Sequence, residues 1–257
     1  MSRQALAERF AALHRKGDPV VLFNAWDAGS AKAIAQAGAP AIATSSWAVA
    51  AAHGHDDGEA IALDLVEAIV ARIVASVALP VTVDVEGAYS DDPAKGATNV
   101  ARIVDRGAVG INFEDRVVAG KGLHAIATQA ARIAAIRRMA EARGVPLFVN
   151  ARCDVFFGAG GAADPMADAI ARAKAYADAG ASGFFVPGLV DIDAIRTLVA
   201  ASPLPVNVMG MPKLPEADAL AGAGVARISH GPAAYVAAMA AVTTGAQAAY
   251  AARKQAA

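Results

Sequence analysis

Residues 107–154 read GAVGINFEDRVVAGKGLHAIATQAARIAAIRRMAEARGVPLFVNARCD, and this stretch contains one complete unit of the fold. The short apolar run Gly110–Phe113 precedes a stretch with helical spacing, Ala125–Ala142. A second apolar run, Leu147–Asn150, follows Gly144. Short apolar runs are typical of buried parallel strands, and a glycine just past a helix favours a left-handed C-terminal cap. The stretch therefore predicts a strand–helix–strand unit with parallel strands.

The same rhythm repeats along the chain. Eight apolar runs are predicted as strands: Val20–Asn24, Ala41–Thr44, Val81–Asp84, Gly110–Phe113, Leu147–Asn150, Gly183–Val186, Val206–Val208 and Ala226–Ser229. Eight stretches are predicted as the helices between and after them: Ala28–Ala37, Ile61–Ser76, Ala94–Arg106, Ala125–Ala142, Pro165–Ala179, Asp191–Ala201, Pro215–Ala223 and Ala233–Ala252. Eight such units predict one α/β domain, residues 1–257, folded as a (β/α)8 TIM-type barrel. A doubly wound open sheet is the alternative, and a further helix, Gln4–Lys16, would cover the bottom of the barrel.

Composition excludes several classes of protein. The chain has 23 Lys and Arg against 24 Asp and Glu, and a net charge of −1 gives no electrostatic footprint for nucleic acid. The single cysteine, Cys153, cannot form an internal disulfide, and we expect a buried, unreactive thiol there. The hydrophobic fraction of 56% is inflated by 70 alanines, and we expect neither a membrane span nor a signal peptide. These features predict a cytoplasmic protein.

Charged side chains are scarce, at 18% of the chain, yet they gather at the ends of three predicted strands. Asp84 and Glu86 end the third strand, Glu114 and Asp115 the fourth, and Arg152 the fifth. In a barrel these carboxyl ends meet at one mouth, where active sites are built. Crowded carboxylates repel one another unless a cation or protons compensate, and oxygen ligands suit a hard cation. We therefore expect Mg²⁺ there, with Mn²⁺ as an alternative.

Each of these carboxylates taken alone also has a simpler interpretation, as a helix N-cap or a surface charge. Asp27, directly before the predicted helix at 28–37, is interpreted as such an N-cap. The histidines lack the spacing of zinc ligands. The joint placement of Asp84, Glu86 and Glu114 is what favours a metal site.

Six segments together resemble the isocitrate lyase/phosphoenolpyruvate mutase superfamily. They are FNAWDAGSA (23–31), ATSSWAVAAAHGHDDGE (43–59), PVTVDVEGAYSDDP (80–93), GAVGINFEDR (107–116), PLFVNARCD (146–154) and GVARISHGP (224–232). The resemblance implies an α/β barrel whose last helix is often swapped between subunits, so a homodimer or homotetramer is expected. It also implies a Mg²⁺-dependent site for a small 2-oxo acid or its enolate.

Residue by residue, the resemblance implies that Asp84 binds the metal directly. Asp57, Glu86 and Glu114 would act through metal-bound water. The turn Ser45, Ser46 and Trp47 looks like the family's substrate-carboxylate turn, with Ser46 in place of the usual glycine. Arg152 resembles the arginine that binds the substrate's anionic end. Asn207, at the end of the seventh strand, is a further substrate-binding candidate.

The chain departs from the family pattern after Glu114. The loop RVVAGKGLHAIAT (116–128) lacks both the cysteine motif of the isocitrate and methylisocitrate lyases and the Pro-Lys-x-Asn-Ser pattern of the mutases. Tyr89, Lys121 and His124 are therefore the candidate proton donors, beside Arg152 and Glu114 as further catalytic candidates.

The resemblance favours a lyase that cleaves or decarboxylates a small 2-oxo or 2-hydroxy di- or tricarboxylate through an enolate. A phosphonopyruvate-type mutase or hydrolase, and a non-catalytic 2-oxo acid binding protein, are the alternatives.

Overall fold

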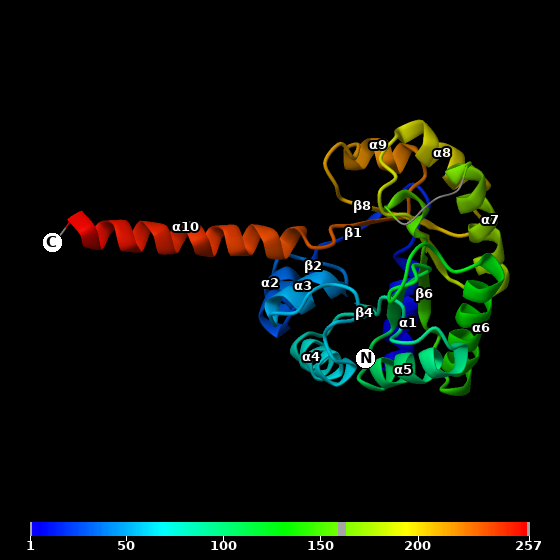
Figure 1. The fold of residues 1–257 in the computed structure, drawn as a ribbon, viewed down its shortest axis with the longest axis horizontal. Helices are drawn as coiled ribbons and strands as arrows, with labels where there is room; N and C mark the ends of the chain where they lie inside the picture. Colours follow the sequence, from blue (N-terminus) through cyan, green and yellow to red (C-terminus); the bar gives the residue numbers. More distant parts are fainter. Residues whose placement is uncertain (1, 159–162, 256–257) are drawn as a thin grey trace.

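The computed structural model describes residues 2–158 and 163–255, and their strands form one closed parallel barrel (Figure 1). The strands are β1 (Val20–Leu22), β2 (Asn24–Ala25), β3 (Ile42–Thr44), β4 (Val81–Asp84), β5 (Gly110–Glu114), β6 (Phe148–Arg152), β7 (Gly183–Phe185), β8 (Val206–Met209) and β9 (Arg227–Ser229). The helices are α1 (Arg3–Ala12), α2 (Ala28–Gln36), α3 (Ser46–Ala52), α4 (Leu63–Ser76), α5 (Pro93–Asp105), α6 (Ile126–Ala142), α7 (Pro165–Asp178), α8 (Ile192–Ala201), α9 (Ala217–Gly222) and α10 (Ala233–Gln255). The predicted barrel is confirmed.

The first predicted strand is divided in two and closes the barrel. β1 pairs with β9 and β2 pairs with β3, both in parallel, with Phe23 between the two segments. The strand order therefore runs from β1 through β9 and back down to β2 without an exposed sheet edge. This closure excludes the open doubly wound sheet.

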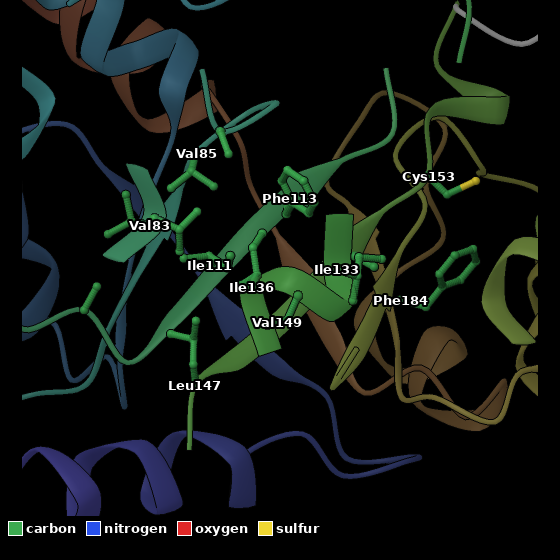
Figure 2. Close-up of a cluster of buried hydrophobic side chains, with 14 of the residues drawn as sticks. Val83, Val85, Ile111, Phe113, Ile133, Ile136, Leu147, Val149, Cys153 and Phe184 are labelled. Atoms are coloured by element: carbon green, nitrogen blue, oxygen red, sulfur yellow. The ribbon is translucent and has the colours of Figure 1, made fainter. Parts of the chain in front are cut away.

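Each strand has an outer face and a face toward the barrel axis, and successive side chains point to these two faces in turn. The two faces therefore carry different kinds of side chain. Ile111 and Phe113 of β5 and Val149 of β6 face outward and pack with Ile133 and Ile136 of α6 in the apolar layer (Figure 2). The residues between them face the barrel axis and are polar. Asn150 of β6 donates to Asn112 of β5 inside the barrel, at 2.9 Å. Polar side chains are thereby directed toward the barrel mouth.

The N-terminal helix covers the opposite end of the barrel, as predicted. Ala7 and Phe10 of α1 are fully buried in a small cluster with Leu22, Val109 and Phe148. The Phe10 and Phe148 rings meet edge to face, with centroids 5.4 Å apart. Because this end is closed, the site lies at the carboxyl ends of the strands.

One element differs from the expectation. The turn expected at Ser45, Ser46 and Trp47 is instead the start of the short helix α3, with Ser45 as its N-cap. The last helix, α10, leaves the barrel and projects away from it (Figure 1). No helix in the described ranges 2–158 and 163–255 is long and apolar enough to cross a membrane.

Candidate active site

Strand ends position the acidic and basic side chains at one mouth. Asp84 ends β4, Glu114 ends β5 and Arg152 ends β6. Register places Glu114 directly beside Arg152 and Asp84 beside Asn112. The alternation of the strands therefore presents both carboxylates and the guanidinium to the same space.

Asp84 has one oxygen bound and one free. The backbone N–H and the hydroxyl of Ser46 both donate to Asp84 Oδ2, at 3.2 and 2.7 Å. The Asp84 N–H in turn donates to the hydroxyl of Thr44, at 3.0 Å. Asp84 Oδ1 is buried and has no hydrogen-bond partner in the described chain. A buried carboxylate oxygen without a donor is suited to a cation.

Arg152 is held by two protein carboxylates. Its Nη1 lies 2.9 Å from Glu114 Oε2, and its Nε and Nη2 donate to the two oxygens of Asp154 at 2.6 and 2.8 Å. These ion pairs keep the pKa of Arg152 raised despite its burial. Burial raises the pKa of Glu114 more strongly than the attraction of Arg152 lowers it. The hydrogen bonds to Asp154 use two of the five guanidinium N–H groups, and Nη1 lies beside the Glu114 carboxylate.

The remaining carboxylates repel one another. Burial, followed by the charges of Asp84 and Asp57, raises the pKa of Glu86 to about 8. Burial and the charge of Asp84 also raise the pKa of Asp57. Through these mutual effects Asp57, Asp84, Glu86 and Glu114 form one electrostatic group. Excess negative charge of this kind favours a bound cation.

The donor set fits Mg²⁺ with few direct protein ligands. Within residues 2–158 and 163–255, no three His, Cys, Asp or Glu side chains lie close enough together to hold a metal ion directly. Mg²⁺ usually keeps several waters and takes one or two carboxylates. A small cavity with room for about one water molecule is lined by Thr44, Ser46, Asp84, Glu86 and Tyr89 and by six apolar residues: Val49, Ile61, Val66, Ile69, Val70 and Val83. Asp84 Oδ1 is thus suited to direct binding, and its neighbours to binding through water.

The predicted substrate-binding residues have different local roles. The Ser45 hydroxyl caps α3 by accepting from the Ala48 N–H at 3.4 Å, and Ser46 binds Asp84. Trp47 is 39% exposed, and its ring lies 6.0 Å from that of Tyr235. Asn207 is buried, where its amide donates to the Ser229 hydroxyl at 3.2 Å.

Of the three candidate proton donors, Tyr89 lines the small cavity together with Asp84 and Glu86. Burial and the nearby carboxylates raise the pKa of its phenol, which stays protonated at neutral pH. His124 instead faces Asp91, 3.3 Å from its carboxylate, and Lys121 is exposed. The structure therefore brings Tyr89, but neither His124 nor Lys121, against the carboxylates of the cavity.

Asp115 was expected at the mouth with its neighbours, and that expectation is wrong. It comes directly after Glu114, so its side chain points to the other face of the strand. There it accepts from the Tyr176 hydroxyl at 2.7 Å and pairs with Arg172 at 3.0 Å. Asp115 is fully buried in this outer network and ties β5 to α7.

Three residues at the site were not identified from the sequence. Glu59, Gln129 and Arg132 bind the backbone or side chains around Glu86 and Glu114. Gln129 and Arg132 are polar residues on the buried face of α6. A polar pair at that position in an otherwise apolar face is a sequence signal that could have identified them.

Comparison with known proteins decides the family. A family model described as phosphoenolpyruvate phosphomutase matches residues 10–250, nearly the whole chain. The chain belongs to the phosphoenolpyruvate mutase/isocitrate lyase superfamily. This superfamily includes lyases, mutases and hydrolases, and the resemblance inferred from the sequence is confirmed.

Individual superfamily members show the range of that similarity. An uncharacterized protein of Mycobacterium tuberculosis is 39% identical over 239 residues, which cover 93% of this chain and 88% of that protein. A 2-methylisocitrate lyase from Salmonella typhimurium is 30% identical over 212 residues, covering 80% and 70%. A solved structure from Burkholderia cenocepacia J2315, described as a candidate phosphonomutase, is 45% identical with a TM-score of 0.93, covering 96% and 100%.

Phosphonopyruvate hydrolase, solved in complex with oxalate and Mg²⁺, shares the fold at 23% identity. Its TM-score is 0.82, and the match covers 95% of this chain and 85% of that one.

Proposed function

We propose that this superfamily member is a Mg²⁺-dependent carbon–carbon lyase acting on a small 2-oxo or 2-hydroxy di- or tricarboxylate. Cleavage would follow a retro-aldol or a decarboxylation route through an enolate. The observation that carries the proposal is the unpaired buried oxygen of Asp84, which lies among the repelling carboxylates and opposite Arg152. Mn²⁺ is the alternative ion for the same oxygen donors.

Each residue has a role that follows from its chemistry. Asp84 would hold the metal directly, and Asp57, Glu86 and Glu114 would hold it through water. When bound, the ion supplies positive charge that stabilises an enolate as it forms. Arg152 would use N–H groups that Asp154 does not engage to bind the substrate's carboxylate.

The turn Ser45, Ser46 and Trp47 would position the other end of the acid, so that the breaking bond aligns with the π system. Tyr89 is our proposed proton donor for the enolate, because its phenol stays protonated and lines the cavity beside Asp84.

A phosphonate reaction is the second candidate. It is favoured by the description of the matching family model and by that of the Burkholderia structure. The same site chemistry serves both reactions, because breaking a P–C bond beside a ketone also leaves an enolate.

The test is an activity screen with oxaloacetate, isocitrate, methylisocitrate, dimethylmalate and phosphonopyruvate. We expect Mg²⁺-dependent cleavage of one carboxylate substrate by the wild-type protein, above the rate produced by Mg²⁺ alone. Asp84→Ala should reduce turnover to that background and weaken Mg²⁺ binding in calorimetry. Asp218→Ala, at an exposed position on α9, is the matched control and should behave as wild type.

Each other outcome selects a different function. Phosphate release from phosphonopyruvate alone would favour the phosphonate reaction. Tight binding of oxalate without any turnover would favour a 2-oxo acid binding protein. Full activity and Mg²⁺ affinity in Asp84→Ala would overturn the proposed site.

We also propose that the chain assembles as a homodimer or homotetramer through α10. Val21 and Phe23, at 45% and 44% exposed, are apolar side chains on the outer face of the first strand. An apolar groove of about 720 Å³ includes Val21, Phe23 and Ile34, and a second of about 420 Å³ includes Val21 and Leu220. An α10 helix from a second copy is our proposed occupant, because α10 carries exposed apolar side chains and projects from its own barrel (Figure 1).

A further inference from the structure

Strained backbone is concentrated beside the acidic group. In the described ranges, five residues other than glycine have positive φ, and four of them meet in one place. Glu59 has a φ of 60°, and Glu86, Ala88 and Tyr89 have φ of 49°, 59° and 57°. Left-handed backbone is unfavourable for such residues and persists only when surrounding contacts impose it. The turn that presents Glu86 and Tyr89 must therefore be held from outside.

Glu59 makes the first set of contacts that stabilise the 86–89 turn. Its backbone N–H donates to Glu86 Oε2 at 3.0 Å, and its own carboxylate accepts from the Tyr89 N–H at 2.7 Å. The turn is also tightly packed at Gly87, where a Cβ would lie 2.9 Å from Val118 and 3.0 Å from Glu59 Oε1. Glu59 thus fixes both ends of the 86–89 turn.

Arg132 on α6 makes the second set of contacts that stabilise this turn. Arg132, only 2% exposed, donates through Nη2 to the carbonyls of Gly87 and Ser90, at 2.6 and 3.1 Å. Its Nη1 donates to Gln129 Oε1 at 2.6 Å, and Gln129 Nε2 donates to the carbonyl of Glu114 at 3.0 Å. One buried pair therefore connects the turn that carries Glu86 with the strand end that carries Glu114.

The Arg132 guanidinium also packs on the ring of Phe113. Arg132 Cζ lies 4.7 Å from the centre of the Phe113 ring, which packs in the layer between β5 and α6 (Figure 2). A planar cation placed over an aromatic face has one preferred orientation, so its hydrogen bonds are directed at the turn.

We propose that Arg132, together with Gln129, is a positioning residue that sets Glu86 and Glu114 for metal-bound water. This inference rests on the proposed function, because it assigns the pair to the same Mg²⁺ site. Groups that orient metal-binding side chains typically change metal affinity by about 10- to 100-fold when they are removed. Within the described part of the chain, Arg132 makes no hydrogen bond to the carboxylates of the site, and it acts through the backbone of residues 87–90 and through Gln129.

The same helix offers a matched control. Arg137 makes partly buried hydrogen bonds, each 2.9 Å long, to the carbonyls of Gly180 and Leu147 and to the hydroxyl of Ser182. These acceptors precede β6 and β7, at the opposite end of the barrel from the site. Both arginines contribute to stability, but only Arg132 holds the strained turn.

The experiment compares Arg132→Lys with Arg137→Lys. Both should lower the melting temperature, because lysine replaces only part of each set of hydrogen bonds. Calorimetric Mg²⁺ affinity should fall about 10-fold or more in Arg132→Lys and stay within about twofold of wild type in Arg137→Lys. Hydrogen exchange of a peptide spanning residues 84–91, measured without metal, should accelerate in Arg132→Lys alone.

Wild-type Mg²⁺ affinity and unchanged exchange at 84–91 in a folded Arg132→Lys protein would overturn the inference. If the wild-type protein binds no Mg²⁺, the proposed function fails, and the exchange comparison still decides whether Arg132 holds the turn. If Arg132→Lys does not fold, Gln129→Met replaces it, since it removes the link to Glu114 and keeps the bonds to Gly87 and Ser90. Weaker Mg²⁺ binding supports the pair's role, and unchanged binding contradicts it.

Discussion

At the scale of single residues, His14 lies at the closed end of the barrel, where burial disfavours its protonated form. Its ring stacks on Phe148 with centroids 4.0 Å apart, and Nδ1 lies 2.9 Å from the Phe10 carbonyl. Burial, and then the charge of Arg227, lowers the pKa of His14 to about 3. The imidazole is therefore neutral in the folded protein at any physiological pH.

This shift predicts an acid-dependent loss of stability. Between pH 6.5 and 3 the unfolded chain binds a proton at His14 that the folded chain does not, so stability decreases as pH falls. The slope from this residue is roughly 1.4 kcal/mol per pH unit. Urea unfolding at pH 7.5 and 5 should show a smaller decrease in His14→Leu than in wild type. His55→Leu, at an exposed position, should keep the wild-type decrease. A decrease in His14→Leu as large as that of wild type would contradict the assignment.

The raised pKa of Glu86 predicts the opposite pH dependence of stability in the metal-free protein. Its pKa of about 8 means that the folded chain retains a proton between pH 4.5 and 8 that the unfolded chain loses. Stability from this group therefore falls as pH rises through that window. Without metal, Glu86→Gln should have a higher melting temperature than wild type at pH 9, by several degrees, and little advantage at pH 5. In calorimetry its Mg²⁺ affinity should be weaker. An equal melting difference at both pH values would show that repulsion among the carboxylates is not its cause.

At the scale of elements, β5 separates two acidic neighbours into different environments. Glu114 faces the barrel mouth and pairs with Arg152, whereas Asp115 faces α7 and pairs with Arg172 and Tyr176. Period-two alternation is the whole cause of the difference. One strand therefore supplies a site residue and a structural anchor in succession.

A pair of isosteric variants should separate these roles. Asp115→Asn should cost about 3–5 kcal/mol of unfolding free energy, because Arg172 loses its buried partner. Its Mg²⁺ affinity should remain within about threefold of wild type, equivalent to less than 1 kcal/mol. Glu114→Gln should show the reverse, with weaker Mg²⁺ binding and a smaller loss of stability. The measurements are urea unfolding and calorimetry. A large loss of Mg²⁺ affinity in Asp115→Asn would show that Asp115 contributes to the site after all.

At the scale of the whole molecule, α10 projects from its own barrel and is mostly exposed (Figure 1). It carries exposed Val236, Met239, Val242 and Tyr250, and Val242 is 63% exposed. A long helix of alanine and apolar residues gains most of its stability from packing. We propose that α10 packs on a partner surface, and that the apolar grooves beside Val21 are that surface.

Disrupting either side of this contact should change the assembly. Val242→Lys on the arm and Val21→Lys in the groove should each shift the molar mass measured by light scattering toward that of the monomer. The physical reason is the same for both, since a lysine ammonium would be buried without a partner. Leu65→Lys, an exposed apolar position on α4, is the control and should keep the wild-type mass. A wild-type monomer, or unchanged assembly in both variants, would contradict the swapped arrangement.

Local sequence determined the elements and their inward and outward faces. The repeated strand–helix–glycine pattern predicted the barrel, and strand ends correctly gathered Asp84, Glu86, Glu114 and Arg152. The N-cap at Asp27 was also predicted, and its carboxylate accepts from the Ser30 N–H at 2.7 Å. These features depend on the period of neighbouring residues and on short-range capping, which are readable along the chain.

Tertiary structure alone decided what depends on distant segments. The strained 86–89 turn is imposed by Glu59 and Arg132, which are separated from it by 27 and more residues. No local preference predicts left-handed backbone at those positions. The outer network of Asp115 likewise became visible only when α7 was packed against β5. Sequence patterns thus placed the charged groups at the barrel mouth, whereas long-range hydrogen bonds, which no local pattern encodes, fixed their precise orientation.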